Sequence, residues 1–458
     1  MAPPLTPHRS GSLLLRGVSL LEGPDQPARQ ADVRLDLRDG TLLGWSLGDG
    51  DATPAAATAT AAAAATAAAT ATAEAPALAG PAQEVDGRGC WLGPPLVDPH
   101  SVLEEPCQGR AETLASLAAA AAAGGYGTVA LLPWARGWRD RPERLDLHWP
   151  EPLRLELWGA FSRDGADEEL APHGDQLEAG AVGLASGESL PPVALLERGL
   201  CLAEMGSAPV LMAPRDPALA ARGFVRERVE ALRAGWPPDP VLSETLALQS
   251  LLTLAAAAPE VQLRLMNLAT AEGVALLRAA PRPPLATVCW WHLLADSGSL
   301  DPADEGWRLV PSLGGPDDRE ALIAALADGL IAAVAIHHQA LDAEEQLLPL
   351  DQRRPGMAGH GPALGLLWQE LVEHRGWSAA LLWQRLCWGP ASFLGLAPEI
   401  LQPGSRRWIL FDPQAERRWA GPSLAANRPV AEAPVRGAVV ASGLSDPLDW
   451  WLRAGPGR

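Results

Sequence analysis

Lysine is missing from this 458-residue sequence, so all 36 basic residues are arginine. A bias toward codons for arginine, alanine, glycine, proline and tryptophan explains this, and 18 tryptophans beside one tyrosine and four phenylalanines fit the same bias. Whatever its origin, the absence excludes any mechanism in which a lysine amine forms a Schiff base or acts as the catalytic base.

Disulfide patterns, long apolar runs and a net positive charge are also missing. The five cysteines lack CxxC spacing, so neither a zinc knuckle nor a disulfide framework is expected. No apolar run reaches about 20 residues and the N-terminus has no signal-peptide core, so we expect a cytoplasmic protein without a membrane partner. A net charge of −19 argues against nucleic-acid or anionic-membrane binding. The hydrophobic fraction of 48% is typical of a globular chain with a sizeable core.

Four segments differ in their patterning. Residues 1–50 alternate short apolar runs with turn signals such as Asp39-Gly40, which predicts β-strands. Residues 51–82 are an Ala/Thr-rich tract without large side chains to bury, and we expect a disordered insertion there. Residues 83–397 alternate strand and helix patterns. Residues 398–458 return to strand patterns, so the two chain ends are expected to form one small discontinuous β-domain.

The segment 83–397 predicts an α/β fold, a TIM-like (β/α)8 barrel, because short apolar runs alternate with helical stretches. The eight strand candidates are Leu96–Val97, Thr128–Leu132, Leu153–Leu157, Ala181–Leu184, Pro209–Met212, Val261–Leu265, Ala286–Trp290 and Ala332–Ile336. The helix candidates between them are Ala111–Ala123, Pro191–Met205, Ser243–Ala258, Ala271–Ala279 and Arg319–Ala327.

The first of these strands leads into the most informative motif of the chain, Gly93–Pro106. Alternate residues of a strand face the same side, so a His-x-His pair at a strand end can bind one metal ion. Here His100 is followed two residues later by Val102, which leaves half of such a pair.

The order and spacing of these segments resemble the dihydroorotase family of cyclic amidohydrolases over most of the chain. Each matching piece is short, and their shared order carries the resemblance. The pieces are Gly93–Pro106, Glu112–Leu132, Pro209–Asp216, Ser243–Glu244, Leu268–Gly273, Trp291–Leu293, Val310–Leu322, Gly329–His338, Pro390–Leu396 and Leu410–Pro413.

The functional positions implied by the resemblance are mostly altered. Where the family has His-x-His followed by an arginine for the substrate carboxylate, this chain has His100, Val102 and Glu104. An acidic residue repels the carboxylate that arginine holds by a two-pronged hydrogen bond. Trp134 stands at the position of a substrate-binding asparagine, and the metal-bridging position falls near Ser186, in a chain that has no lysine to carboxylate.

The remaining positions are altered too. Two further metal-ligand histidines correspond to Ala213 and Asn267, and the catalytic aspartate corresponds to His337. The substrate motif Asn-Pro-Pro-Leu-Arg reads Val-Pro-Ser-Leu-Gly at 310–314. Hydrolysis of a cyclic amide needs a metal-activated hydroxide, a base and positive charge for the oxyanion. We therefore expect a dihydroorotase-like protein that has lost catalysis and binds no cofactor.

Two interpretations of the surviving histidines stay open. His100 and His337 lie at the ends of neighbouring barrel strands, and with His338 or Asp98 they are candidates for a mononuclear zinc site. Alternatively, they are relic residues that are hydrogen-bonded in a polar pocket. Trp134 then fills the space that the metals and the substrate occupy in the family. The first interpretation implies a cyclic amidohydrolase with a rebuilt site. The second leaves a role that the resemblance implies, as structural partner of aspartate carbamoyltransferase in pyrimidine biosynthesis, within an oligomer or hetero-complex.

Overall fold

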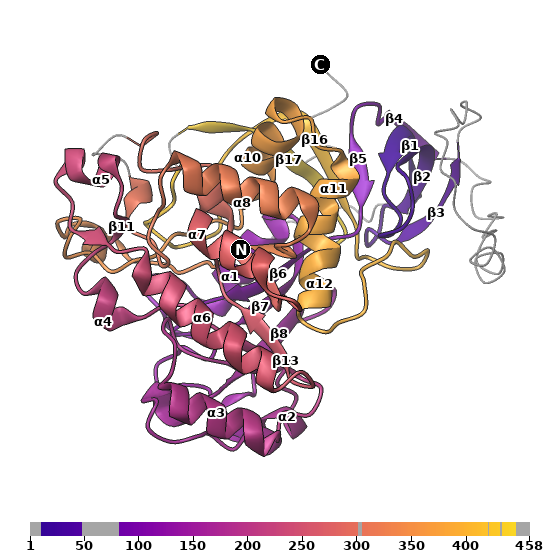
Figure 1. Cartoon of the computed structure of the whole chain (residues 1–458). Coiled ribbons are helices and arrows are strands. Elements are labelled where there is room, and N and C mark those ends of the chain that lie inside the picture. The colour runs from indigo at the N-terminus through magenta and orange to yellow at the C-terminus, as the bar shows by residue number, and fades with distance from the viewer. Residues whose placement is uncertain (1–10, 48–81, 301–304, 420, 431–432, 446–458) are drawn as a thin grey trace. The chain divides into compact units, whose positions relative to one another are not determined.

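The computed structural model describes residues 11–47, 82–300, 305–419, 421–430 and 433–445. The Ala/Thr-rich tract expected at 51–82 therefore lies outside the described residues, apart from Ala82. The chain divides into two compact units (Figure 1). Unit 1 comprises Met1–Pro94, Ile400–Pro413 and Val439–Arg458, and unit 2 comprises Pro95–Glu399 and Gln414–Ala438.

Unit 1 is built on one mixed sheet to which both chain ends contribute. Its strands follow the order β17-β16-β5-β1-β2-β3, and β4 pairs with β1. The sheet begins as an antiparallel meander, in which β1 carries a bulge between Leu15 and Val18 and Gly17 takes a φ of 68°. The strands are β1 (Ser12–Leu20), β2 (Arg29–Asp36), β3 (Leu42–Leu47), β4 (Ala82–Asp86), β5 (Trp91–Gly93), β16 (Ile409–Arg418) and β17 (Pro434–Ser442).

The sequence patterns change at residues 83 and 398, but the two units divide at different places, after Pro94, Glu399, Pro413 and Ala438. β5 pairs with β1 and β16, so residues 83–94 belong with the accessory sheet. Residues 414–438 belong with the barrel, because backbone and side-chain groups of Ser423 and Leu424 bond to Glu112 at the start of the first barrel helix.

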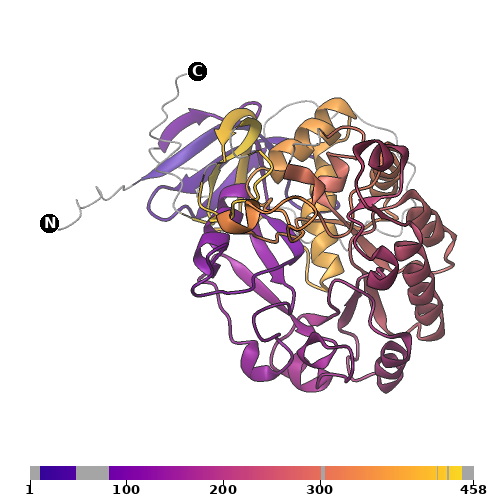
Figure 2. The same cartoon turned by 90° about the vertical axis from the view of Figure 1, so that its left-hand side faces the viewer.

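Unit 2 is the predicted barrel, a nearly closed sheet of eight parallel strands with helices outside it (Figures 1 and 2). Strands such as β7 are buried along their whole length, which is why they read as continuous apolar runs. The barrel strands are β6 (Leu96–Ser101), β7 (Tyr126–Leu131), β8 (Arg154–Ala160), β9 (Gly183–Ala185), β10 (Pro209–Met212), β13 (Gln262–Leu265), β14 (Leu285–Cys289) and β15 (Ala333–Ala335); β11 (Val225–Arg226) and β12 (Pro238–Asp239) form a separate pair.

Local signals set the ends of the helices. Thr113 accepts a bond from Ser116 N at the start of α1, and Gly125 ends that helix with a φ of 91°. The helices are α1 (Leu114–Gly124), α2 (His173–Glu178), α3 (Val193–Leu202), α4 (Pro217–Ala220), α5 (Val229–Ala234), α6 (Leu242–Ala257), α7 (Ala271–Ala279), α8 (Pro316–Asp328), α9 (Ala343–Gln346), α10 (Ala363–Leu367), α11 (Ala379–Trp383) and α12 (Gly389–Phe393). Within the described residues, no helix is long and apolar enough to cross a membrane.

The first and last barrel strands are joined largely by side chains. Val102 N donates to His338 O at 2.7 Å, beyond the end of β6. Asp98 Oδ1 accepts from Ile336 N at 2.9 Å, and Ser101 Oγ accepts from His338 N at 2.8 Å. These bonds hold β6 and β15 side by side, although the two strands are far apart in sequence. They therefore bring the residues at the ends of the two strands close together.

Candidate functional site

His100 and His337 meet at the carboxyl ends of β6 and β15, as their places in the barrel predict. Their Nδ1 atoms lie 3.1 Å apart, and both side chains are buried. The other ring nitrogen of His100, Nε2, lies 2.9 Å from Thr287 Oγ1 on β14. Each ring nitrogen of His100 is thus engaged by a protein group.

In this contact one Nδ1 donates and the other accepts, so the accepting imidazole must be neutral. Burial, together with the neighbouring His337, lowers the pKa of His100 to about 3. Burial also lowers the pKa of His337 to about 4. The lone pair of the accepting Nδ1 is used in the hydrogen bond between the rings, and the donating Nδ1 carries a proton in place of a lone pair.

Asn267 and His337, two of the altered family positions, have left-handed backbone conformations directly after their strands. Their φ angles are 50° and 48°. Asn267 Oδ1 accepts from Thr287 Oγ1 at 3.2 Å, so Asn267 and His100 share the same threonine. Asn267 Nδ2 is buried without a partner among the described residues. The strand ends thus keep a special backbone shape while their side chains form a small neutral network.

Apolar side chains fill the rest of this end of the barrel. Val102, Trp134, Ala213 and Met266 belong to one buried cluster inside the barrel. Trp134 is 8% exposed, donates its Nε1 proton to Ser186 O at 2.9 Å, and packs edge-on against His337 with ring centres 5.8 Å apart. Trp134 therefore occupies the barrel end as the sequence suggested.

The cavity that remains beside these residues is too small for a substrate. It measures about 10 Å³ and is lined by Trp134, Glu188, Ala213, Asn267 and His337, among others. A single water molecule needs at least about 10–15 Å³ of such space. The space thus admits at most one water.

His338 does not join His100 and His337, so the three-histidine site considered above is not formed. Its Nε2 lies 3.2 Å from Glu112 Oε2, and its ring packs against that of His360 with centres 5.1 Å apart. His337 lies after the end of β15 with a φ of 48°, and beyond this left-handed residue the side chain of His338 contacts Glu112.

Asp98 also has a structural partner. His360 Nε2 lies 2.8 Å from Asp98 Oδ2, and both side chains are fully buried. Burial raises the pKa of Asp98, but bonds from His360 and Ser101 outweigh that effect and lower it. Glu112 behaves in the same way. Burial raises its pKa, but the bond with His338 outweighs that effect, and the pKa falls to about 2. His360 stands in a loop without a motif, and sequence reasoning missed it.

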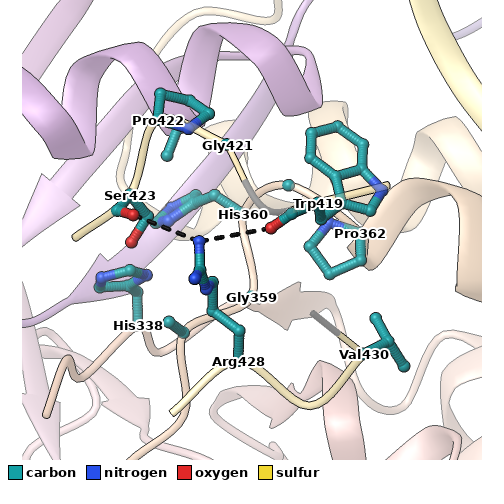
Figure 3. A pocket seen from close by; sticks show the side chains of 13 residues that line it. His338, Gly359, His360, Pro362, Trp419, Gly421, Pro422, Ser423, Arg428 and Val430 are labelled. Atoms are coloured by element: carbon teal, nitrogen blue, oxygen red, sulfur yellow. Dashed lines mark hydrogen bonds between the residues drawn. The ribbon is translucent and has the colours of Figure 1, made fainter. Parts of the chain in front are cut away.

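Figure 3 shows His338 and His360 beside a small cavity closed by the loop after β16. Arg428 holds this loop by donating to Trp419 O and Ser423 O, each at 3.3 Å. The cavity measures about 20 Å³, enough for a single water near the unpartnered Nδ1 atoms of the two histidines. It is too small for a ligand.

Glu104 points away from the histidine pair. It is exposed and forms an ion pair with Arg354 at 2.6 Å, and Arg354 also binds Glu345 at 2.6 Å. These residues line a cleft of about 330 Å³ that contains both acidic and basic side chains. Glu104 thus belongs to a charged surface cleft.

The donor set does not fit a metal ion. Within the described residues, no three His, Cys, Asp or Glu side chains gather where they would hold one. His100 and His337 are bonded to each other, and the neighbouring positions carry Val102, Ala213 and Trp134. Zinc needs three or four nitrogen, sulfur or oxygen ligands around one point.

Known structures define the class of this fold. The chain is similar to the L-hydantoinase (dihydropyrimidinase) of Arthrobacter aurescens, with a TM-score of 0.69, 17% identity and 94% of each chain covered. It is equally similar to the D-hydantoinase (dihydropyrimidinase) of a Thermus species, with a TM-score of 0.69, 16% identity and 94% of each chain covered. The fold is that of the cyclic amidohydrolases.

Sequence relatives identify the family. The chain is 32% identical over 402 residues to the probable dihydroorotase-like protein of Synechocystis sp., covering 79% of this chain and 89% of that protein. It is 30% identical over 349 residues to the dihydroorotase of Thermus aquaticus, covering 72% and 82%. No family model matches. The chain belongs to the dihydroorotase family and is a degenerate member that lacks most of the metal ligands.

Proposed function

We propose that this protein is a catalytically inactive dihydroorotase homologue that acts as a structural partner of aspartate carbamoyltransferase in pyrimidine biosynthesis. The observation that carries the first half is the contact between His100 and His337. The two imidazoles bind each other at 3.1 Å, in surroundings filled by Trp134, Val102 and Ala213.

This arrangement counts against the requirements of cyclic amide hydrolysis. A metal-activated hydroxide needs a metal with an open coordination position, and the donor set for one does not converge. The oxyanion needs positive charge, yet the two histidines are neutral near pH 7 because burial depresses the pKa of both. The substrate needs space, and only about 10 Å³ remains.

The second half of the proposal rests on the family resemblance and on what the fold retains. Inactive members of the dihydroorotase family serve aspartate carbamoyltransferase as structural partners, and the resemblance implies the same role for this chain. The barrel keeps complete strands, helix caps and a dense core after losing its chemistry. Retention of a well-packed fold without its reaction is most simply explained by a surface that a partner needs.

A first experiment tests catalysis. The purified protein is assayed for zinc content and for dihydroorotate turnover, and its gene is placed in a dihydroorotase-deficient strain with the Thermus aquaticus dihydroorotase as positive control. We expect no stoichiometric zinc, no turnover and no growth without added pyrimidine. Growth that is lost in the His100→Ala and His337→Ala variants would refute the inactive assignment.

A second experiment tests the partner. The carbamoyltransferase of the same organism is co-expressed with this chain, and the mixture is separated by size-exclusion chromatography. Co-elution in a constant ratio is the expected result. Separate elution of the two proteins over a range of concentrations contradicts the partnership while leaving the first experiment untouched.

The alternative function is a cyclic amidohydrolase with a rebuilt mononuclear site. Only the approach of His100 to His337 favours it, and a third ligand is needed. His338 is engaged with Glu112, and Asp98 with His360. Near-stoichiometric zinc in the first experiment would support this alternative.

A further inference from the structure

A groove of about 500 Å³ lies at the amino-terminal end of the barrel strands. The C-terminal part of α6, the starts of β13 and β14, and residues 280–284 between α7 and β14 form its walls (Figure 1). Small-molecule sites in proteins are typically concave spaces of about 300–1,000 Å³. The groove is therefore large enough for a small organic molecule, unlike the spaces beside the histidines.

Most of the groove wall is apolar, and one side of it is stiff. α6 contributes Leu252 and β13 contributes Leu263, while the loop on the other side contributes Pro281, Pro283 and Pro284. We call residues 280–284 the proline loop. Each proline has a fixed φ, so the proline loop keeps its shape without a ligand. A preformed apolar wall of this kind suits a ligand with an apolar body, because little conformational freedom is lost on binding.

Arg264 is a charged side chain of this wall, and it is only 9% exposed. Its guanidinium donates to neutral oxygens alone. Nε donates to Phe393 O at 3.2 Å, and Nη1 donates to Leu263 O at 3.3 Å. Both terminal nitrogens lie 3.4 Å from Gln262 Oε1. These distances are at or beyond the long end of the usual range of about 2.7–3.2 Å, so the terminal N–H groups are weakly satisfied.

A buried arginine normally has a carboxylate partner. Arg226 shows this arrangement, because its guanidinium lies 3.2 Å from Asp239 and 3.1 Å from Glu244. Burial lowers the pKa of Arg264, and no carboxylate of the described residues opposes that shift. The missing counter-charge of Arg264 can therefore come only from an anion that enters the groove.

The charges around the groove favour such an anion. Arg282 stands in the proline loop, is exposed, and lines the same groove as Arg264. Among the described residues that line the groove, none is an aspartate or a glutamate. In a chain with a net charge of −19, a groove with two arginines and no acid is electrostatically distinct from most of the surface. The guanidinium fork matches the oxygens of a carboxylate or a phosphate.

From these observations we propose that the groove binds an amphipathic organic anion. Its oxyanion head group contacts Arg264 and Arg282, and its apolar body lies against Leu252 and the proline loop. The groove is at the amino-terminal ends of the strands, whereas His100 and His337 lie at the carboxyl ends. The proposal therefore stands apart from the proposed function, and neither metal content nor carbamoyltransferase binding enters its test.

Isothermal titration calorimetry of the full chain tests the proposal with octanoate as the probe. Octanol carries the same apolar body without the charge, and acetate carries the same head group without the body. We expect saturable binding of one octanoate per chain, more than about tenfold tighter than binding of either control compound. Hydrogen bonds to a charged group contribute about 1.5–3 kcal/mol, which corresponds to at least about tenfold in affinity.

Arg264→Met keeps the length of the side chain and removes its charge. It should lower the octanoate affinity more than about tenfold, to that of octanol. The matched control is Arg139→Met, since Arg139 is 3% exposed and donates to the carbonyl oxygens of Leu103 and Leu132, but lies outside the groove. Loss of a buried arginine at that place should leave octanoate binding unchanged.

A change at the exposed arginine gives an independent test, which decides the matter if Arg264→Met does not fold. Arg282→Gln should weaken octanoate binding by up to about fivefold, because an exposed charge contributes less. Its control is Arg198→Gln, at an exposed arginine of α3, which should have no effect. Circular dichroism establishes that each variant is folded. The proposal is overturned by octanoate binding no tighter than octanol, or by unchanged octanoate affinity in folded Arg264→Met or in Arg282→Gln.

Discussion

The Nδ1 atoms of His100 and His337 lie 3.1 Å apart inside the barrel, in direct hydrogen-bonding contact. The residues come from the first and last barrel strands, and both rings are buried. A pair of neutral imidazoles satisfies one donor and one acceptor at once, so the buried polar groups are stable without an ion. The contact should therefore affect how stability depends on pH and on zinc.

Stability should depend on pH through this pair. The unfolded histidines titrate near 6.5, whereas burial lowers the pKa of His100 to about 3 and that of His337 to about 4 in the folded protein. Between about pH 6.5 and 4 the unfolded state therefore binds more protons, and the free energy of unfolding should fall as pH falls. Urea unfolding across this range measures the slope.

The matched variant replaces both residues, His100→Asn with His337→Asn. Its stability should fall less steeply between pH 6.5 and 4, although His173 and His292, whose pKa values burial also lowers, keep some slope. An unchanged slope in the double variant would show that burial does not hold the pair neutral in the folded protein over this range.

Zinc should not stabilise the protein through these histidines. A ligand that binds only the folded state raises the temperature of unfolding. Because the facing nitrogens of His100 and His337 bind each other, we expect the same midpoint with added Zn²⁺ and with a chelator. A rise in midpoint that disappears in His100→Ala would contradict this expectation and support the rebuilt metal site.

Trp134 should be important for stability. Trp134→Ala removes a large buried side chain from the core cluster and should cost about 3–5 kcal/mol of unfolding free energy. Trp134→Phe keeps most of the packing and loses the bond to Ser186 O, so its cost should be nearer about 1 kcal/mol. Urea unfolding of both variants measures the difference, and equal small losses would mean that the ring is not packed as described.

Arg226 should stabilise the loops beside the barrel end. Its guanidinium lies 3.2 Å from Asp239 and 3.1 Å from Glu244, and all three side chains are at most 1% exposed. Arg226→Met leaves two buried carboxylates without their counter-charge and should cost about 3–5 kcal/mol. The control Arg163→Met breaks an exposed pair with Glu169 and should change the unfolding free energy little.

Much of the barrel was predictable because its signals are local. Parallel strands buried on both faces appear as apolar runs, and the helix from Ala271 to Ala279 was predicted with its observed ends. The boundaries of the accessory unit were harder to predict. β5 is three residues long, and only its pairing with β1 and β16 assigns it to that unit.

The candidate site was predicted in part. The meeting of His100 with His337 followed from the order of strands in a closed barrel, and Trp134 lies where its bulk suggested. The structure does not group His338 with them, since His338 contacts Glu112 beyond the left-handed residue His337. The partners His360 and Thr287 stand in no motif, so nothing local identified them.

The sequence by itself determined the fold class, the family and the loss of ligand types, because each depends on residues read in order along one segment. The absence of lysine and the replacement of histidines by Val102 and Ala213 hold in any conformation. Only the tertiary structure decided what the surviving groups do. Residues 237 positions apart, His100 and His337, became partners because barrel closure brought their strands together, and apolar side chains such as Trp134 and Val102 packed around them.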